Sequence, residues 1–280
     1  MTNILAERIK NANLTKTQKK IADYFISNQE RIGSLSSIEA AQEIGVSDAS
    51  IIRFSRAIGF DGFADLKDNI YDMLVQNAVS GLSLSERVKK NSETYKNGNV
   101  PEQFQNIMHQ NLVSVFRNNS PESFEKLAQT IVHARNRYVI GLRGCRGTAL
   151  NFGRLLTFML PNVHCLIDGE CASINLLQDI GEGDILVMFV LTRYYKIDIE
   201  CLELAKKKGA TICIIQNELT GPLNKYADLL FVVSTIGMGF FNSTMSMQMI
   251  AEYTLTLIGH HVDYKERLEQ KDYITREQRL

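Results

Sequence analysis

Hydrophobic and polar positions in the first 60 residues alternate with the period of short amphipathic helices. A capping box of Thr15 and Gln18 precedes an apolar stripe, and this pattern predicts a helix that ends near Ser27. The stripe consists of Ile21, Tyr24 and Phe25. A second capping box, Ser36 with Glu39, predicts another helix soon after the first.

A tight glycine turn separates this second helix from a third. The second helix is expected over residues 37–44, and Gly45 ends it because glycine adopts the left-handed conformation at little cost. Ser47 then caps a third helix, which Gly59 closes. Two short helices joined in this way are typical of a helix-turn-helix that binds DNA, although a plain helical hairpin is an alternative interpretation.

The third predicted helix has two faces of different character. Ile51, Phe54 and Ile58 share one face at about 100° per residue, so the opposite face is expected to meet DNA. Arginine can donate two hydrogen bonds to guanine, small side chains allow close approach, and lysine or hydroxyl groups hold phosphates. The predicted DNA-binding residues are Lys16, Ser47, Ala49, Ser50, Arg53 and Arg56.

Three sequence blocks in this region resemble the N-terminal domain of RpiR-type bacterial transcription regulators. The blocks are Leu14–Tyr24, Gly45–Ser50 and Gly59–Phe63. The resemblance implies an all-α helix-turn-helix domain, which we place at residues 1–77. The polar stretch that follows, residues 78–101, is the predicted linker, because its helical stripe weakens and Ser, Asn and Lys accumulate.

Short, continuously apolar runs then alternate with helical segments. Two helices are expected first, over residues 103–117 and 122–134. The runs predict five strands covered on both faces, and hence a parallel, doubly wound α/β sheet. They are Tyr138–Ile140, Val163–Leu166, Ile185–Phe189, Thr211–Ile215 and Leu229–Val233. The domain is expected to span residues 102–262, followed by a charged tail over 263–280.

Ligands of doubly wound sheets bind beyond the carboxyl ends of the strands, where the strand order reverses. The loop after the first predicted strand, Gly141–Thr148, is rich in glycine and leads into a helix N-terminus, which suits an anion. The blocks Gly181–Asp184, Leu204–Ala210 and Pro222–Asp228 resemble a SIS domain. In RpiR-type regulators such a domain is a receptor for phosphosugars or related metabolites rather than an enzyme.

The loop after the third predicted strand departs from the family pattern. Val190–Lys196 replaces the usual Ser-x-Ser-Gly-x-Thr phosphate loop with cations and aromatic residues. We therefore expect cations from both loops to converge on a phosphate or carboxylate, unless they pair with acids such as Glu170 or Glu200. The predicted ligand-binding residues are Arg143, Gly144, Cys145, Arg146, Thr148, Thr192, Arg193, Lys196 and Ser243.

Composition bears on how DNA could be bound and on whether a metal site or a membrane span is present. Lys plus Arg equals Asp plus Glu at 31 each, so DNA contacts must come from local placement. The five cysteines form no C-x-x-C pair, and no apolar run reaches the length of a membrane span. We expect a cytoplasmic homo-oligomer, a dimer or tetramer, without metal or cofactor.

The expected function is a DNA-binding repressor whose operator affinity responds to a phosphosugar or sugar acid. A sugar-phosphate isomerase built on the same fold is the alternative, although no acid and base stand together in the sequence and an enzyme has no need of the first 75 residues. A corepressor-type interaction protein that binds no metabolite is a third hypothesis, left open by the altered loop.

Overall fold

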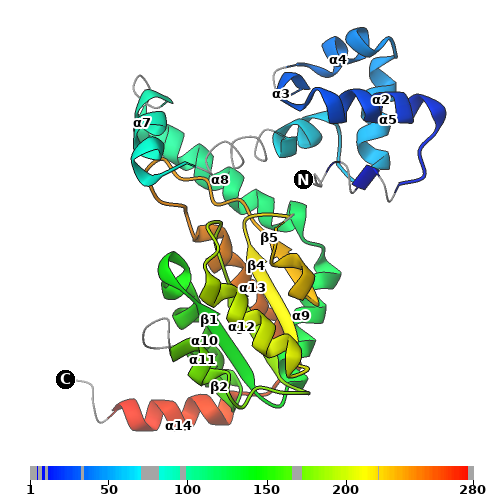
Figure 1. Ribbon diagram of the computed structural model, residues 1–280. Helices are drawn as coiled ribbons and strands as arrows, with labels where there is room; N and C mark the ends of the chain where they lie inside the picture. The colour runs from blue at the N-terminus through cyan, green and yellow to red at the C-terminus, as the bar shows by residue number, and fades with distance from the viewer. Residues whose placement is uncertain are drawn as a thin grey trace. The chain divides into compact units, whose positions relative to one another are not determined.

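The computed structural model describes residues 5, 8–9, 12–32, 35–70, 82–94, 99–165, 172–219 and 221–276. The chain divides into two compact units, Met1–Ser83 and Leu84–Leu280 (Figure 1). The described part of the first unit is built from helices, and the second unit contains a sheet with helices on both faces. The predicted fold classes, all-α followed by α/β, are therefore confirmed.

The three predicted helices of the first unit begin and end close to where the sequence predicts. They are α2 (Lys16–Ser27), α4 (Ser37–Ile44) and α5 (Asp48–Ala57). A short helix that the sequence analysis did not predict, α3 (Gln29–Ile32), follows α2, and residues 63–70 are also helical. Both capping boxes are present: Thr15 Oγ1 accepts the Gln18 N–H at 3.3 Å, and Ser36 Oγ accepts the Glu39 N–H at 3.2 Å. Gly45 ends α4 at a φ of 71°. The helix-turn-helix arrangement is thus set by local sequence signals.

A small aromatic core holds these helices together. The rings of Phe25 from α2 and Phe54 from α5 meet edge-on at 5.4 Å between centroids, and both side chains are fully buried. Phe63 packs on Phe25 at 6.1 Å. Since Ile51 and Ile58 are buried in the same cluster, the inward face of the third predicted helix is confirmed.

The second unit is built on a five-stranded parallel sheet in the order β2-β1-β3-β4-β5. Its strands are β1 (Arg137–Gly141), β2 (Val163–Cys165), β3 (Ile185–Phe189), β4 (Thr211–Gln216) and β5 (Leu229–Val232). All five lie where the apolar runs predict. Because β1 sits between β2 and β3, the strand order reverses there, and the loops after β1 and β3 flank the predicted switch point.

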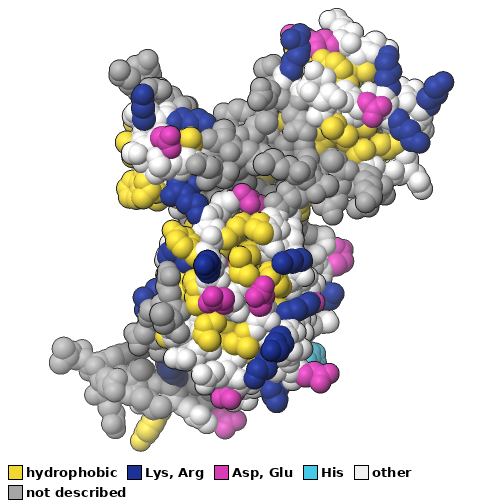
Figure 2. Space-filling view, viewed as in Figure 1, with side chains coloured by type: hydrophobic (Ala, Val, Ile, Leu, Met, Phe, Trp, Pro, Cys, Tyr) yellow, Lys and Arg dark blue, Asp and Glu magenta, His cyan; other side chains and the backbone are white. Residues whose placement is uncertain are grey.

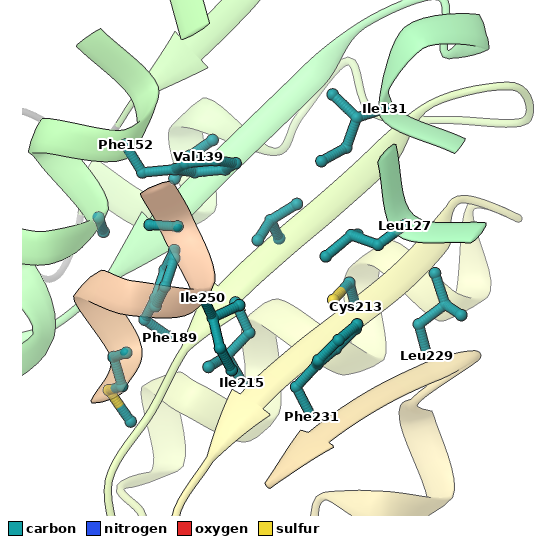
Figure 3. Packing of buried hydrophobic residues seen from close by; sticks show 14 of the residues in the cluster. Leu127, Ile131, Val139, Phe152, Phe189, Cys213, Ile215, Leu229, Phe231 and Ile250 are labelled. Atoms are coloured by element: carbon teal, nitrogen blue, oxygen red, sulfur yellow. The ribbon is translucent and has the colours of Figure 1, made fainter. Parts of the chain in front are cut away.

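Two layers of helices cover the sheet. One face packs against α8 (Val100–Asn118), α9 (Pro121–His133), α10 (Arg146–Met159) and α13 (Met245–His261). In this layer Leu127 and Ile131 of α9 and Ile250 of α13 lie against strand residues such as Ile215 and Phe231 (Figure 3). The other face packs against α11 (Ala172–Leu176) and α12 (Lys196–Lys207). Burial on both faces explains why the strands are continuously apolar.

Two segments outside the predicted sensing domain are helical. Helix α7 (Leu84–Thr94) lies within the range predicted as linker, and its Asn91 Nδ2 donates to the carbonyl of Gly239 at 2.6 Å. The predicted linker range therefore contains a helix that is hydrogen-bonded to the second unit. Helix α14 (Lys265–Arg276) occupies the charged tail, and Arg267 donates to the Thr157 carbonyl of α10 at 3.1 Å. In the described part of the chain, every helix is too short or too polar to cross a membrane.

Candidate DNA-reading helix and ligand site

Helix α5 presents the predicted polar arc to the surface. Ala49, Arg53 and Arg56 are exposed and Ser50 is half-buried, whereas Ile51 and Phe54 are fully buried. Ser47 stands at the N-cap position, but its hydroxyl does not cap the helix; it pairs with the Ser50 hydroxyl at 2.8 Å. Arg53 Nη2 also donates to Ser50 Oγ, at 3.2 Å. Ser47, Ser50 and Arg53 thus form a small hydrogen-bonded group near the start of α5.

The two arginines of the arc are held differently. Arg56 Nε donates to the Asp61 carbonyl at 3.1 Å, which ties it to the turn after α5. Among the described residues, Arg53 is anchored through the Ser50 hydroxyl alone, so its guanidinium keeps more donors for a base. Lys16 is exposed at the first position of α2. Lys and Arg are dispersed over the visible face of this unit rather than gathered into one strip (Figure 2), so local placement has to supply any DNA contact.

At the switch point, the loop after β1 is compact because glycine allows close backbone approach. A Cβ on Gly141 would lie 2.6 Å from Ala149 Cβ and 2.7 Å from the Cys145 carbonyl oxygen. Arg143 to Cys145 then form a single 3₁₀ turn that leads into α10. A Cβ on Gly144 would lie 3.7 Å from Leu191 Cδ1, so the loops after β1 and β3 touch, as predicted for the switch point.

Arg143 pairs with an acid of the protein, which is the alternative that the sequence left open. Its Nη2 lies 2.6 Å from Asp198 Oδ2, and its guanidinium stacks over the Tyr195 ring at 4.1 Å. The Asp198 side chain is fully buried and also accepts the Tyr195 N–H at 2.8 Å, at the start of α12. Among the described residues, the acid that pairs with Arg143 is Asp198 rather than Glu200, and Glu170 lies outside the described residues. Part of the charge of Arg143 is compensated within the protein.

The other predicted residues of the loop after β3 have distinct environments. The Thr192 N–H donates to Asn217 Oδ1 at 2.8 Å, and Asn217 Nδ2 donates to Thr192 Oγ1 at 2.6 Å, so the Thr192 hydroxyl keeps its own proton to donate. Arg193 adopts a φ of 76°, which is rare for a residue with a side chain. Lys196 is exposed at the first position of α12. This loop therefore supplies two cations and a hydroxyl.

Three predicted residues have side chains turned to the interior. Cys145 belongs to the hydrophobic core, and its thiol contacts Met247 Sδ at 3.8 Å. Burial raises the pKa of Cys145 to about 12, so the thiol is neutral near pH 7. The Ser243 hydroxyl donates to Met108 Sδ at 3.5 Å, and Thr148 is buried. Of the β1 loop, Gly144, Arg146 and Gly147 reach the surface beside Arg143.

Sequence reasoning missed two charged residues near these loops. Asp198 gave a weak signal, because an acid at the third position of a helix is a common cap. Arg87 gave none, since it lies in the polar stretch predicted as linker. Yet its side chain is only 4% exposed, and Nη1 donates to Asn242 Oδ1 at 2.7 Å, in the segment between β5 and α13.

Comparisons with known protein families match both units. The model of the rpiR-family helix-turn-helix domain matches residues 3–77, and the model of the SIS domain matches residues 130–257. The chain thus carries an rpiR-family helix-turn-helix domain followed by a SIS domain. This RpiR-type chain is 27% identical over 258 residues to an HTH-type transcriptional regulator of Caldanaerobacter subterraneus, a match that covers 91% of this chain and 88% of the relative.

Solved structures share the fold of this RpiR-type chain. The Vibrio vulnificus NanR protein complexed with ManNAc-6P superposes with a TM-score of 0.56 at 15% identity, covering 99% of each chain. The sugar isomerase domain of an RpiR transcription factor from Sphaerobacter thermophilus gives a TM-score of 0.59 at 20% identity, over 63% of this chain and 99% of that one. These likenesses show a shared fold, and the order of a helix-turn-helix followed by a SIS domain is confirmed by the two family models.

Proposed function

We propose that this chain represses transcription and that an anionic metabolite, a phosphosugar or a sugar acid, controls its affinity for operator DNA. Its place among transcriptional regulators with a helix-turn-helix and a SIS domain is the starting point. The observation that carries the proposal is the pairing of an exposed Ser-Arg arc on α5 with a cation-bearing switch point in the same chain.

The chemistry of the switch point supports an anion as the effector. Arg146, Arg193 and Lys196 belong to the loops that meet there, and Thr192 offers a hydroxyl donor beside them. Cations and hydroxyls bind phosphate and carboxylate through strong, directional hydrogen bonds. The NanR protein that shares the fold was solved with a phosphosugar, ManNAc-6P, which supports a ligand of this class.

Such a ligand would control DNA binding through thermodynamic linkage between the ligand site and the DNA-binding site. A metabolite that binds the DNA-competent and incompetent states differently shifts operator affinity, with a typical coupling of about 1 to 3 kcal/mol, or about 5- to 150-fold. A homo-oligomer is part of the proposal, because a single helix-turn-helix usually gains affinity by binding a two-fold symmetric site.

The test is recovery of genomic DNA fragments by the purified full-length protein, followed by operator binding in the presence of phosphosugars and sugar acids. We expect enrichment of one palindromic site and an affinity change of at least fivefold with one metabolite class. Binding that is salt-sensitive and indifferent to sequence would overturn the DNA-reading assignment. Operator binding that no phosphosugar or sugar acid alters would overturn the assignment of the effector.

A matched pair of variants tests the role of α5. Arg53→Ala should weaken discrimination between operator and non-operator DNA by about 5- to 150-fold for each half-site, because one bidentate base contact contributes about 1–3 kcal/mol. Arg154→Ala removes the same charge from an exposed position of α10 and should leave discrimination unchanged. Equal effects of the two variants would show that Arg53 supplies general charge and does not read a base.

One pair of residues favours an isomerase as a second candidate function. The Tyr194 hydroxyl donates to Glu218 Oε2 at 3.1 Å, just beyond the carboxyl end of β4. Burial raises the pKa of Glu218, against the lowering effect of the Tyr194 hydrogen bond, and a carboxyl group of this kind suits general acid–base catalysis. Turnover of sugar phosphates by the full chain, abolished in Glu218→Gln, would support this candidate; no turnover would remove it.

A further inference from the structure

Helix α7 has an inverted pattern of burial. Among the residues whose side chains are described, 84–92, Arg87 is 4% exposed, while Leu84 and Val88 are 51% and 49% exposed. An amphipathic helix ordinarily buries its apolar residues and leaves its charges in water. Removing an arginine from water is costly unless hydrogen bonds and opposite charge compensate. Helix α7 therefore packs through the charged side chain of Arg87, and this guanidinium requires hydrogen-bond acceptors or an opposite charge.

The protein compensates Arg87 only in part. Nη1 donates to the neutral Asn242 Oδ1 at 2.7 Å, and Nε is buried without a hydrogen-bond partner. Within the described residues, no carboxylate forms an ion pair with Arg87. Burial, and then the nearby positive charge of Arg193, lower the pKa of Arg87. Arg87 and Arg193 thus lie close together, and Arg87 Nε has a hydrogen-bond donor that an anion could use.

The position of Arg87 connects it with the switch point. Its partner Asn242 lies in the segment between β5 and α13, and Arg193 lies in the loop after β3, so both follow carboxyl ends of strands. Asn91, one turn further along α7, donates to the carbonyls of Gly237 and Gly239 in the same segment. Hydrogen bonds therefore hold α7 against the segment that follows the carboxyl end of β5.

We infer that Arg87, with Arg193, receives the anionic group of the effector, a phosphate monoester or a carboxylate, and that α7 carries the response to the DNA-binding unit. The inference rests on the proposed function and adds to it a residue that sets specificity for an anion. Helix α7 begins at Leu84, directly after the unit that ends at Ser83. An anion that completes the hydrogen bonds of Arg87 fixes α7 against the sheet, and so fixes the chain that leaves the DNA-binding unit.

The experiment compares full-length wild type with Arg87→Met and Arg87→Lys by thermal unfolding and calorimetric titration. The probes are inorganic phosphate, glucose 6-phosphate and gluconate, which separate a phosphate site from a carboxylate site. Lys89→Met is the control, because Lys89 is exposed on the same helix. We expect a saturable rise in Tm for wild type and Lys89→Met, and at least about tenfold weaker binding for Arg87→Met.

A purely structural role for Arg87 gives a different result. Without any anion, Arg87→Met should be as stable as wild type or more so, because an apolar side chain replaces an incompletely compensated charge. Arg87→Lys keeps the charge but loses the planar fork, so it should bind phosphate more weakly than wild type and more tightly than Arg87→Met. A Tm loss in Arg87→Met with an unchanged phosphate response would overturn the inference.

Operator binding separates this inference from the proposed function. If a metabolite alters operator affinity equally in wild type and Arg87→Met, control by a metabolite stands and the role of Arg87 is refuted. If phosphate binding depends on Arg87 but no anion alters operator affinity, the site stands and its coupling to DNA is refuted.

Discussion

The ion pair between Arg143 and Asp198 gives a prediction about stability at the switch point. Asp198→Asn keeps the shape of the side chain but replaces one carboxylate oxygen by an amide group. The carboxylate now accepts Arg143 Nη2 at 2.6 Å and the Tyr195 N–H at 2.8 Å, and its side chain is fully buried. Arg143 Nη2 also donates to the other carboxylate oxygen, Oδ1, at 2.9 Å. In Asp198→Asn an NH2 group, which cannot accept, replaces one of the two oxygens, and the negative charge that compensates Arg143 is lost.

The size of the effect follows from burial. Removing one partner of a buried ion pair costs about 3–5 kcal/mol. The Arg143 side chain is 29% exposed and regains some water, so we take the lower end, about 3 kcal/mol. For a folded unit of 150–250 residues, about 1 kcal/mol corresponds to 2–4 °C, so the expected fall in Tm is about 6–12 °C.

The assay is thermal unfolding of the full chain followed by circular dichroism, with Glu200→Gln as the control. Glu200 is exposed on the same helix, α12, and its replacement should change stability by less than about 0.5 kcal/mol. A double-mutant cycle with Arg143→Met should show that the two residues interact, because replacing Asp198 should cost less stability when the guanidinium that donates to it is already absent. Equal Tm values for Asp198→Asn and Glu200→Gln would refute the buried ion pair.

Two further predictions concern the sheet. Burial acts to raise the pKa of Asp184, but hydrogen bonds from Arg135, the Gly181 amide and Asn136 outweigh it and lower the pKa below 3.8. The ionised Asp184 therefore stabilises the folded state above about pH 4, and this stabilisation is lost as the pH falls through the lowered pKa. In urea unfolding, the free energy of unfolding of wild type should exceed that of Asp184→Asn by more at pH 7 than at about pH 3. A difference in free energy that does not depend on pH would contradict this. Gly141→Ala should destabilise the protein by about 1–3 kcal/mol, because its Cβ would lie 2.6 Å from Ala149 Cβ; unchanged urea unfolding would show that the loop relaxes.

The elements of this fold are predictable because each has a local signal. The run Ile185–Phe189 is fully buried in β3, and the capping boxes at Thr15 and Ser36 place the starts of α2 and α4. Hydrophobic period and capping act over a few residues, so one sequence is enough to find them. The inward and outward faces of α5 follow from the same periodicity.

The contacts of the candidate ligand site are not predictable in this way. Arg143 and Asp198 are 55 positions apart, and Arg87 and Asn242 are 155 apart. Arg143 and Arg193 adopt positive φ angles of 52° and 76°, and neither residue type signals that conformation. Helix α7 was missed because it packs through Arg87 and Asn91 rather than through an apolar stripe.

The contrast between the buried strand β3 and the exposed loop after it has a consequence for which sequence changes this chain can tolerate. The strand is wholly buried between two helical layers, so almost any substitution there threatens folding. The segment that follows, residues 191–196, is at least partly exposed throughout and already differs from the family's phosphate loop. If the proposed effector binds at this end of the sheet, a few loop substitutions can change which anion is bound while the folded scaffold stays intact.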